Sequence, residues 1–177
     1  AVARLIGAKP GEIGFTSGAT ESTNLALRGF LSANRKAGKH IVTLPTEHKC
    51  VLEALHQLEG DGFSVTTVGV GPNGLPDLGE LEQAIRSDTV LLCAMYANNE
   101  TGVVLPVHEI AVIARRHGVA FFCDGTQAVG KITVDVKTTG MDLMAFTAHK
   151  IYGPKGVGAI YIRGGIHMGL VRPLITG

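Results

Sequence analysis

The chain has no tryptophan, three cysteines and few aromatic residues, which make up 5% of its 177 positions. Cys50, Cys93 and Cys123 are widely spaced, which predicts reduced thiols in a reducing compartment rather than a disulfide framework or a zinc site. No apolar run approaches the roughly 20 residues that cross a bilayer. The net charge of +1 gives no electrostatic basis for binding nucleic acid or an anionic membrane.

Apolar residues make up 45% of the sequence and charged residues 18%, which is typical of a globular α/β domain. The length suits one domain with a well-buried core. Residues 1–7 have neither the basic nor the long apolar stretch of a signal peptide. They resemble the tail of a helix and include no initiator methionine, so we expect the chain to be part of a longer polypeptide.

Apolar, β-branched runs alternate with helical patterns along the chain. Strands are expected at residues 41–44, 64–68, 89–96, 119–123, 142–146 and 158–162. Helices are expected at residues 20–36, 50–59, 78–85 and 107–117, and a turn at residues 71–74 precedes the third of them, which starts at Pro76 and Asp77. Apolar strands separated by helices predict an α/β fold, with a mostly parallel sheet and helices on both faces.

Polar groups follow the expected strands, at the edge where such sheets bind ligands. Lys150 lies in one of these places, close to Thr147 and His149 and before a glycine–proline turn. A lysine amine there can form a Schiff base, while the hydroxyl and imidazole can hold an anion. Taken alone, the segment is equally compatible with a solvated lysine at the exit of a strand.

A second polar segment, Ser17-Gly18-Ala19-Thr20, precedes an expected helix. Unpaired N–H groups and the dipole at a helix start favour an anion, and the Thr20 hydroxyl adds a donor. The simpler alternative is an ordinary helix cap formed by Thr20, with Glu21 in the first turn. The loop has neither the Walker spacing nor the GxGxxG spacing.

Three further residues have both a chemical and a structural interpretation. Asp124 follows the expected strand 119–123, where a buried carboxylate needs a partner such as a pyridinium nitrogen, unless it caps its own turn. The Gln127 side chain can donate a hydrogen bond to the phenolic oxygen of a bound cofactor, or it is an ordinary surface residue. The His48 imidazole can stack on the ring of a bound cofactor and move protons near neutral pH, although a lone histidine is more often structural. Nearby, Cys50 at an expected helix start has a setting that lowers a thiol pKa, but a packing role is favoured.

Together these segments resemble the cysteine desulfurases of the NifS/IscS type, in the class V aminotransferase group of fold type I pyridoxal 5′-phosphate (PLP) enzymes. The resemblance runs in family order from Ile13 to Arg163 through FTSGATESTNLAL, PTEHKCVLEAL, YANNETG, FFCDGTQAVGKI and DLMAFTAHKIYGPKGVGAIYIR. Thr147 stands where the family more often has serine, and Ala148 where it often has glycine. Both substitutions preserve the hydroxyl group or the small size.

The resemblance implies PLP as cofactor, no metal, and a role for each site residue. Lys150 and His48 are the implied catalytic residues: Lys150 forms the Schiff base with PLP, and His48 stacks on its ring. Asp124 pairs with the pyridine nitrogen and Gln127 bonds the phenolic oxygen. The remaining implied contacts are Ala19, Thr20, Thr147 and His149 around the phosphate, and Asn99 near the cofactor and the substrate carboxylate.

The implied reaction converts L-cysteine to L-alanine, with sulfur passed to a cysteine persulfide for iron–sulfur cluster or other sulfur-cofactor assembly. In the family that cysteine and the substrate-binding arginine belong to a C-terminal part. Residues 1–177 are therefore expected to be an incomplete PLP-binding large domain, without an N-terminal segment and the small domain and inactive alone. The family also implies a homodimer, an iron–sulfur scaffold or other sulfur acceptor as partner, and a cytoplasmic location, or a mitochondrial or plastid one in a eukaryote.

Other interpretations remain open on the sequence alone. A selenocysteine lyase or a cystine lyase has the same cofactor chemistry, and a small-molecule aminotransferase has the same general fold. A non-catalytic scaffold with the PLP-enzyme fold belongs to a different functional class. The presence of Lys150, Asp124, His48 and Gln127 together argues against the scaffold.

Overall fold

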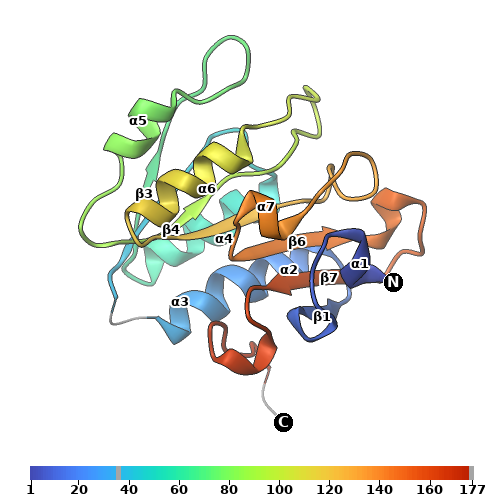
Figure 1. Cartoon of the computed structure of the whole chain (residues 1–177). Coiled ribbons are helices and arrows are strands. Elements are labelled where there is room, and N and C mark those ends of the chain that lie inside the picture. Colours follow the sequence, from blue (N-terminus) through green and yellow to red (C-terminus); the bar gives the residue numbers. More distant parts are fainter. Residues whose placement is uncertain (35–36, 176–177) are drawn as a thin grey trace.

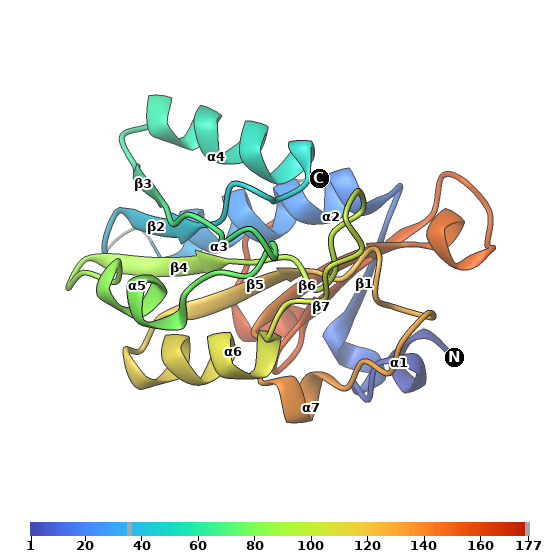
Figure 2. The same ribbon diagram turned by 90° about the horizontal axis from the view of Figure 1, so that it is seen from above.

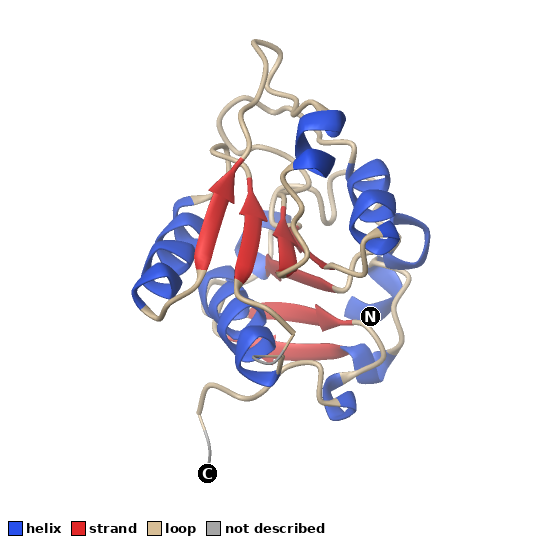
Figure 3. Cartoon of the chain, turned by 90° about the vertical axis from the view of Figure 1, so that its left-hand side faces the viewer, coloured by secondary structure: helices blue, strands red, loops and turns tan. Residues whose placement is uncertain are grey.

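The computed structural model describes residues 1–34 and 37–175. Its centre is a seven-stranded sheet in the order β1-β7-β6-β5-β4-β2-β3 (Figure 1). The strands are β1 (Ile13–Thr16), β2 (His40–Thr43), β3 (Ser64–Thr67), β4 (Thr89–Cys93), β5 (Ala120–Asp124), β6 (Leu143–Thr147) and β7 (Gly158–Ile162). Strands β2 to β6 run parallel, whereas β7 is antiparallel to both β6 and β1. The sheet is strongly twisted, so strands at its two ends point in different directions (Figure 3).

Helices cover both faces of the sheet (Figure 2). One face carries α2 (Ala19–Asn24), α3 (Phe30–Ala33) and α4 (Lys49–Gly60). The other carries α1 (Val2–Leu5), α5 (Leu78–Gln83), α6 (Val107–Arg116) and α7 (Val136–Thr139). Short 3-10 turns lie at Pro10–Glu12, Ala148–Ile151 and Ile166–Met168. The predicted α/β fold, with a mostly parallel sheet between two helical layers, is confirmed.

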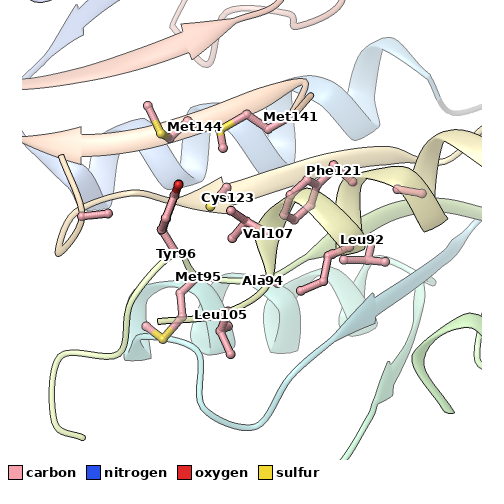
Figure 4. Close-up of a cluster of buried hydrophobic side chains, with 14 of the residues drawn as sticks. Leu92, Ala94, Met95, Tyr96, Leu105, Val107, Phe121, Cys123, Met141 and Met144 are labelled. Carbon is pink, nitrogen blue, oxygen red and sulfur yellow. The ribbon is translucent and has the colours of Figure 1, made fainter. Parts of the chain in front are cut away.

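Side-chain alternation along the central strands builds two hydrophobic cores, one on each face of the sheet. In β5, Phe121 and Cys123 point to the core under α6, whereas Phe122 points to the core under α2 and α4. Met144 of β6 lies in the first core and Leu143 in the second. Figure 4 shows part of the first core, where side chains of β5 and β6 lie near Met95 and Tyr96, which follow β4. Because consecutive residues of a strand face opposite sides, a strand buried on both faces is apolar throughout.

Several element boundaries differ from the expected ones. Strand β5 ends at Asp124 itself, so this carboxylate lies in the sheet rather than after it. The strand expected at 89–96 ends at Cys93, although Ala94 and Tyr96 still donate backbone hydrogen bonds to β5. The helix expected at 20–36 is α2, a π-type turn over Leu25–Gly29, and α3. Residues 35–36 of that prediction lie outside the described residues.

The expected turn and helix start before α5 are confirmed. Gly74 donates a hydrogen bond to the carbonyl of Gly71, and Asp77 caps α5 by accepting from the N–H of Glu80. Strand β1 was missed by the sequence prediction because it is a four-residue edge strand and its aromatic side chain, Phe15, is 71% exposed. No helix within residues 1–34 and 37–175 has the length and apolar character needed to cross a bilayer.

Candidate active site

A cavity of about 330 Å³ opens where the carboxyl ends of β4, β5 and β6 meet the starts of α2 and α4. Every residue predicted for the site from the sequence lies in its wall. The wall comprises Gly18, Ala19, Thr20, His48, Cys50, Met95, Ala97, Asn99, Asp124, Thr126, Gln127, Thr147, His149 and Lys150. The parallel sheet therefore brings together groups that are far apart in the sequence, at the edge where such sheets bind ligands.

The start of α2 forms one end of the cavity. Gly18, in an extended conformation, is the residue before the helix, so the alternative in which Thr20 caps it is wrong. The Ser17 N–H and hydroxyl both donate to the Glu21 carboxylate, which lowers the pKa of Glu21 and fixes this turn. The helix N–H groups and the Thr20 side chain remain available at the wall.

Strand β7 packs directly against this turn. A Cβ atom on Gly158 would lie 2.4 Å from the carbonyl carbon of Gly18, so only glycine allows the two backbones to approach so closely. Beside it, the Thr147 hydroxyl donates to the carbonyl of Val157 at 3.0 Å and lies 3.1 Å from Nδ1 of His149. These contacts fix the end of β6 next to the helix start.

Asp124 is 4% exposed, and its Oδ1 accepts a hydrogen bond of 2.9 Å from the N–H of Thr126. The interpretation in which Asp124 caps its own turn is confirmed, and the same carboxylate also lines the cavity. Within residues 1–34 and 37–175 it forms no ion pair. The half-buried Gln127 lines the same wall and accepts a hydrogen bond from Lys131 through Oε1.

His48 is the exposed residue that caps α4, and its Nδ1 accepts from the N–H of Cys50 at 3.2 Å. The same nitrogen lies 3.0 Å from Sγ of Cys50. Burial raises the pKa of Cys50 to about 11, and the negative charges of Asp124 and Glu47 contribute to that increase. Burial therefore outweighs the helix start, which agrees with a packing role for Cys50 rather than an activated thiol.

Lys150 lies in the short 3-10 turn Ala148–Ile151 that follows β6. Its side chain is exposed and lines the cavity, and it forms no ion pair within the described ranges 1–34 and 37–175. The turn ends at Tyr152, whose φ of 62° is unusual for a residue other than glycine. The amine is thus accessible on a tightly folded segment.

Two residues of this region were missed from the sequence. Glu47 is 5% exposed and lies behind the wall, where burial raises its pKa to about 8. Only its position beside His48 could have drawn attention to it. Thr126, in the wall of the cavity, has a buried hydroxyl that forms no hydrogen bond with any of the described residues. Its place between Asp124 and Gln127 was the available signal.

His48, Cys50 and Asp124 also form a group of possible metal ligands, with one ligand atom of each within 4.8 Å of the others. The sequence predicted no metal at this place. The donor set is the one that zinc and similar cations prefer, namely nitrogen, sulfur and carboxylate oxygen.

Comparisons with known proteins identify the family of the chain. Residues 1–177 match the family model "Aminotransferase class-V". The cysteine desulfurase IscS of Pectobacterium carotovorum is 51% identical over 162 residues, which cover 92% of this chain and 40% of the relative. The IscS of Cronobacter sakazakii is 53% identical over the same coverage. The chain thus spans about two fifths of the length of these relatives.

Solved structures of similar proteins match the whole described fold. A NifS-like protein has a TM-score of 0.94 at 41% identity, covering 99% of this chain and 48% of its own. A structure described as SspA in complex with cysteine has a TM-score of 0.94 at 39% identity, covering 99% and 50%. The match to the family model along its full length, together with these relatives, shows that the chain belongs to the class-V aminotransferase family.

Proposed function

We propose that the chain binds PLP in this cavity and forms part of a cysteine desulfurase, which converts L-cysteine to L-alanine and passes the sulfur to a cysteine persulfide. One observation carries the proposal: an accessible lysine, a helix start and a buried carboxylate that has no cation partner among residues 1–34 and 37–175 surround the same cavity. The names of the similar proteins, cysteine desulfurase IscS and NifS-like protein, support the choice of reaction.

The residues fit PLP in charge and in size. Asp124 is a buried carboxylate that lacks a positive partner among the described residues, and a protonated pyridine nitrogen supplies one. The Thr126 hydroxyl, which is buried and unbonded within the described part of the chain, belongs to the same turn. The start of α2 offers N–H groups for a phosphate. A volume of about 330 Å³ lies within the usual range for cofactor sites.

Each wall residue then has an assigned task. Lys150 would provide the amine for the covalent link to PLP, Asp124 would hold the pyridine nitrogen, and the Gln127 amide, whose oxygen accepts from Lys131, would donate to the phenolic oxygen. Of the other residues in the wall, His48 would cover the ring, Asn99 would lie on the substrate side, and the phosphate would be held by Ala19, Thr20, Thr147 and His149. When bound, PLP supplies an electron sink for negative charge that forms at the Cα atom of an amino acid.

The protein groups move the protons. Lys150 lies on a short turn in the wall, where its amine would take the Cα proton of the substrate. Nδ1 of His48 accepts from the N–H of Cys50, which leaves Nε2 to carry the proton of a neutral ring. His48 is therefore placed as a donor toward the departing sulfur or the Cα atom.

The sulfur acceptor is proposed to be a cysteine outside residues 1–177. Cys93 and Cys123 are fully buried, and burial raises the pKa of each thiol well above its ordinary value. Cys50 lies in the wall with a pKa of about 11. None of the three is a ready nucleophile, because the thiolate is the reactive form.

The same proposal extends to the whole protein. Residues 1–177 act as the PLP-binding large domain of a homodimer located in the cytoplasm, or in a mitochondrion or plastid of a eukaryote. The product sulfur passes to an iron–sulfur scaffold or another sulfur-acceptor protein. The relatives named IscS support this context.

The first test is borohydride reduction of the chain mixed with PLP, followed by intact mass and peptide mapping. We expect one PLP adduct on Lys150, none in Lys150→Ala, and an unchanged adduct in the control Lys155→Ala, which alters an exposed lysine nearby. The second test measures L-alanine and sulfide from L-cysteine with the whole protein. An adduct spread over surface lysines, or a whole protein that forms no alanine, would contradict the proposal.

A further inference from the structure

The side of the cavity nearest α4 brings together three different metal-binding groups. His48 and Cys50 come from the start of α4, and Asp124 comes from the end of β5. Their ligand atoms lie within 4.8 Å of one another. Asp124 is 4% exposed, it is aimed into the cavity, and one of its oxygens receives no hydrogen bond from the described residues. A buried carboxylate in that state calls for a positive partner.

The distances already approach those of a bound metal. Zinc lies about 2.3 Å from sulfur and about 2.0 Å from nitrogen, so a tetrahedral site separates the two atoms by roughly 3.5 Å. Nδ1 of His48 and Sγ of Cys50 are 3.0 Å apart. The distance between Nδ1 and Sγ therefore has to increase by only about half an ångström for a metal to bind. Metal binding also breaks the 3.2 Å hydrogen bond from the N–H of Cys50 to Nδ1.

The charges around these groups also favour a cation. The negative charge of Asp124 acts on the Cys50 thiol, and no lysine or arginine pairs with this carboxylate within the described part of the chain. Burial, together with the negative charge of Asp124, keeps the thiol protonated. A divalent cation displaces that proton to solvent and becomes bound to the thiolate, which the start of α4 also stabilises.

We propose that, in the absence of its cofactor, the chain binds a zinc-like divalent cation through Sγ of Cys50, Nδ1 of His48 and the carboxylate of Asp124, with water as the fourth ligand. The cation and PLP exclude each other, because His48 and Asp124 serve both. Metal binding stands on the geometry of the chain alone, whereas the exclusion rests on the proposed function. The site makes cofactor loading sensitive to thiol-binding metals.

The two sites share some residues and differ in others, which allows a direct test. Cobalt(II) chloride is added to the cofactor-free chain, and the absorption bands of tetrahedral cobalt and of thiolate-to-cobalt charge transfer are recorded. We expect one cobalt per chain. Cys50→Ala should abolish the charge-transfer band and weaken cobalt binding by more than about 100-fold. Loss of a residue that only hydrogen-bonds to a metal ligand weakens metal binding by roughly 10–100-fold, so a larger effect indicates a direct ligand. Circular dichroism checks that the variant is folded.

Lys150→Ala is the matched control, because Lys150 contributes to PLP binding and not to the metal. We expect Lys150→Ala to bind cobalt like the wild type and to lose the PLP adduct, while Cys50→Ala loses cobalt and keeps the adduct. Saturation with PLP should prevent the cobalt spectrum in the wild type. A folded Cys50→Ala with an unchanged cobalt spectrum, or equal cobalt binding with and without bound PLP, would overturn the proposal.

The outcomes also separate this site from the proposed function. Cobalt bound through Cys50, together with no PLP adduct on the wild type, supports the metal site and contradicts the proposed function. A PLP adduct on Lys150 together with no thiolate–cobalt band supports the proposed function and contradicts the metal site.

Discussion

The backbone N–H of Met95 donates a hydrogen bond of 2.5 Å to Oε1 of Glu47, which joins the segment after β4 to the turn before α4. A second bond runs in parallel, from the Asn98 side chain to the carbonyl of Thr46 at 3.0 Å. These bonds fix the turn that carries His48 to the segment that carries Asn99. The cavity wall therefore depends on a carboxyl group that does not line it.

Glu47 should give the chain a stability that decreases as the pH rises. Burial raises its pKa from an ordinary value of 4.5 to about 8 in the folded state, so the unfolded chain releases this proton first. The stabilisation is complete below about pH 4.5 and is lost between there and about pH 8. Glu47→Gln keeps an acceptor for Met95 and removes the proton, so its unfolding free energy should lack this decrease, which amounts to about 2–4 kcal/mol.

The measurement is urea unfolding of both proteins at pH 5, 6, 7 and 8. The change of the unfolding free energy with pH is compared between the two proteins, rather than its value at one pH. Glu53→Gln, an exposed position on α4, serves as the control and should follow the wild type. Parallel curves for Glu47→Gln and the wild type would show that Glu47 is ionised in the folded chain.

His40 should control the acid side of the same stability curve. The ring is fully buried, with Nδ1 2.6 Å from the Thr89 hydroxyl and Nε2 2.8 Å from that of Thr66. Burial lowers its pKa from 6.5, and the nearby Arg86 lowers it further, although Asp88 acts in the opposite direction. The folded state thus holds a neutral ring, and its stabilisation is complete above pH 6.5 and is lost as the pH falls below that value.

The variant His40→Gln should be less stable at pH 8, by about 1–2 kcal/mol, because a ring with two hydrogen bonds is lost from between two strands. Its further loss between pH 6.5 and pH 5 should be smaller than that of the wild type. Thermal unfolding across this range, with exposed His56→Gln as control, makes the comparison. If His40→Gln loses as much stability as the wild type between pH 6.5 and pH 5, groups other than His40 cause that loss.

Gly158 should matter for the cofactor more than for the sheet. A Cβ at this position meets the backbone of Gly18, so Gly158→Ala must push the start of α2 away from β7. Overpacking of this kind costs about 1–3 kcal/mol. We expect PLP affinity to fall at least about tenfold while the chain still folds. Equilibrium dialysis measures the PLP affinity of Gly158→Ala and of the control Gly60→Ala, where a Cβ meets nothing within 4 Å. Equal PLP affinities of the two variants would show that the turn before α2 relaxes freely.

The sequence predicted the layered fold because the central strands are apolar on both faces, and this pattern has few alternatives. It also predicted that Lys150, Asp124 and His48 meet, since the carboxyl ends of parallel strands share one edge. Strand β1 was not found because edge strands need no apolar alternation, and Phe15 is exposed. Strand β7 was found, but its antiparallel direction depends on pairing with β6, which no local pattern records.

The chemistry of Cys50 and Glu47 lay beyond local sequence reasoning for a different reason. The helix start at Cys50 suggested a lowered pKa, whereas its burial and two negative neighbours raise it. One of those neighbours, Asp124, is 74 positions away in the sequence. A pKa reflects all the groups packed around an atom, so it follows from the tertiary structure and not from the segment.

Asp124→Asn should separate the two tasks of this residue. Asparagine keeps an oxygen for the N–H of Thr126, so the turn after β5 should persist and the cofactor-free chain should fold. Without the negative charge, the pyridine nitrogen loses its ionic partner, which is worth about 1.5–3 kcal/mol. PLP affinity should therefore fall by about 10–100-fold, and the absorption of the bound cofactor should change because the ring nitrogen is no longer protonated. Asp77→Asn, which exchanges one good helix cap for another at the start of α5, should leave affinity and absorption unchanged. An Asp124→Asn chain that binds PLP as tightly as the wild type and with the same spectrum would show that this carboxylate serves only its turn.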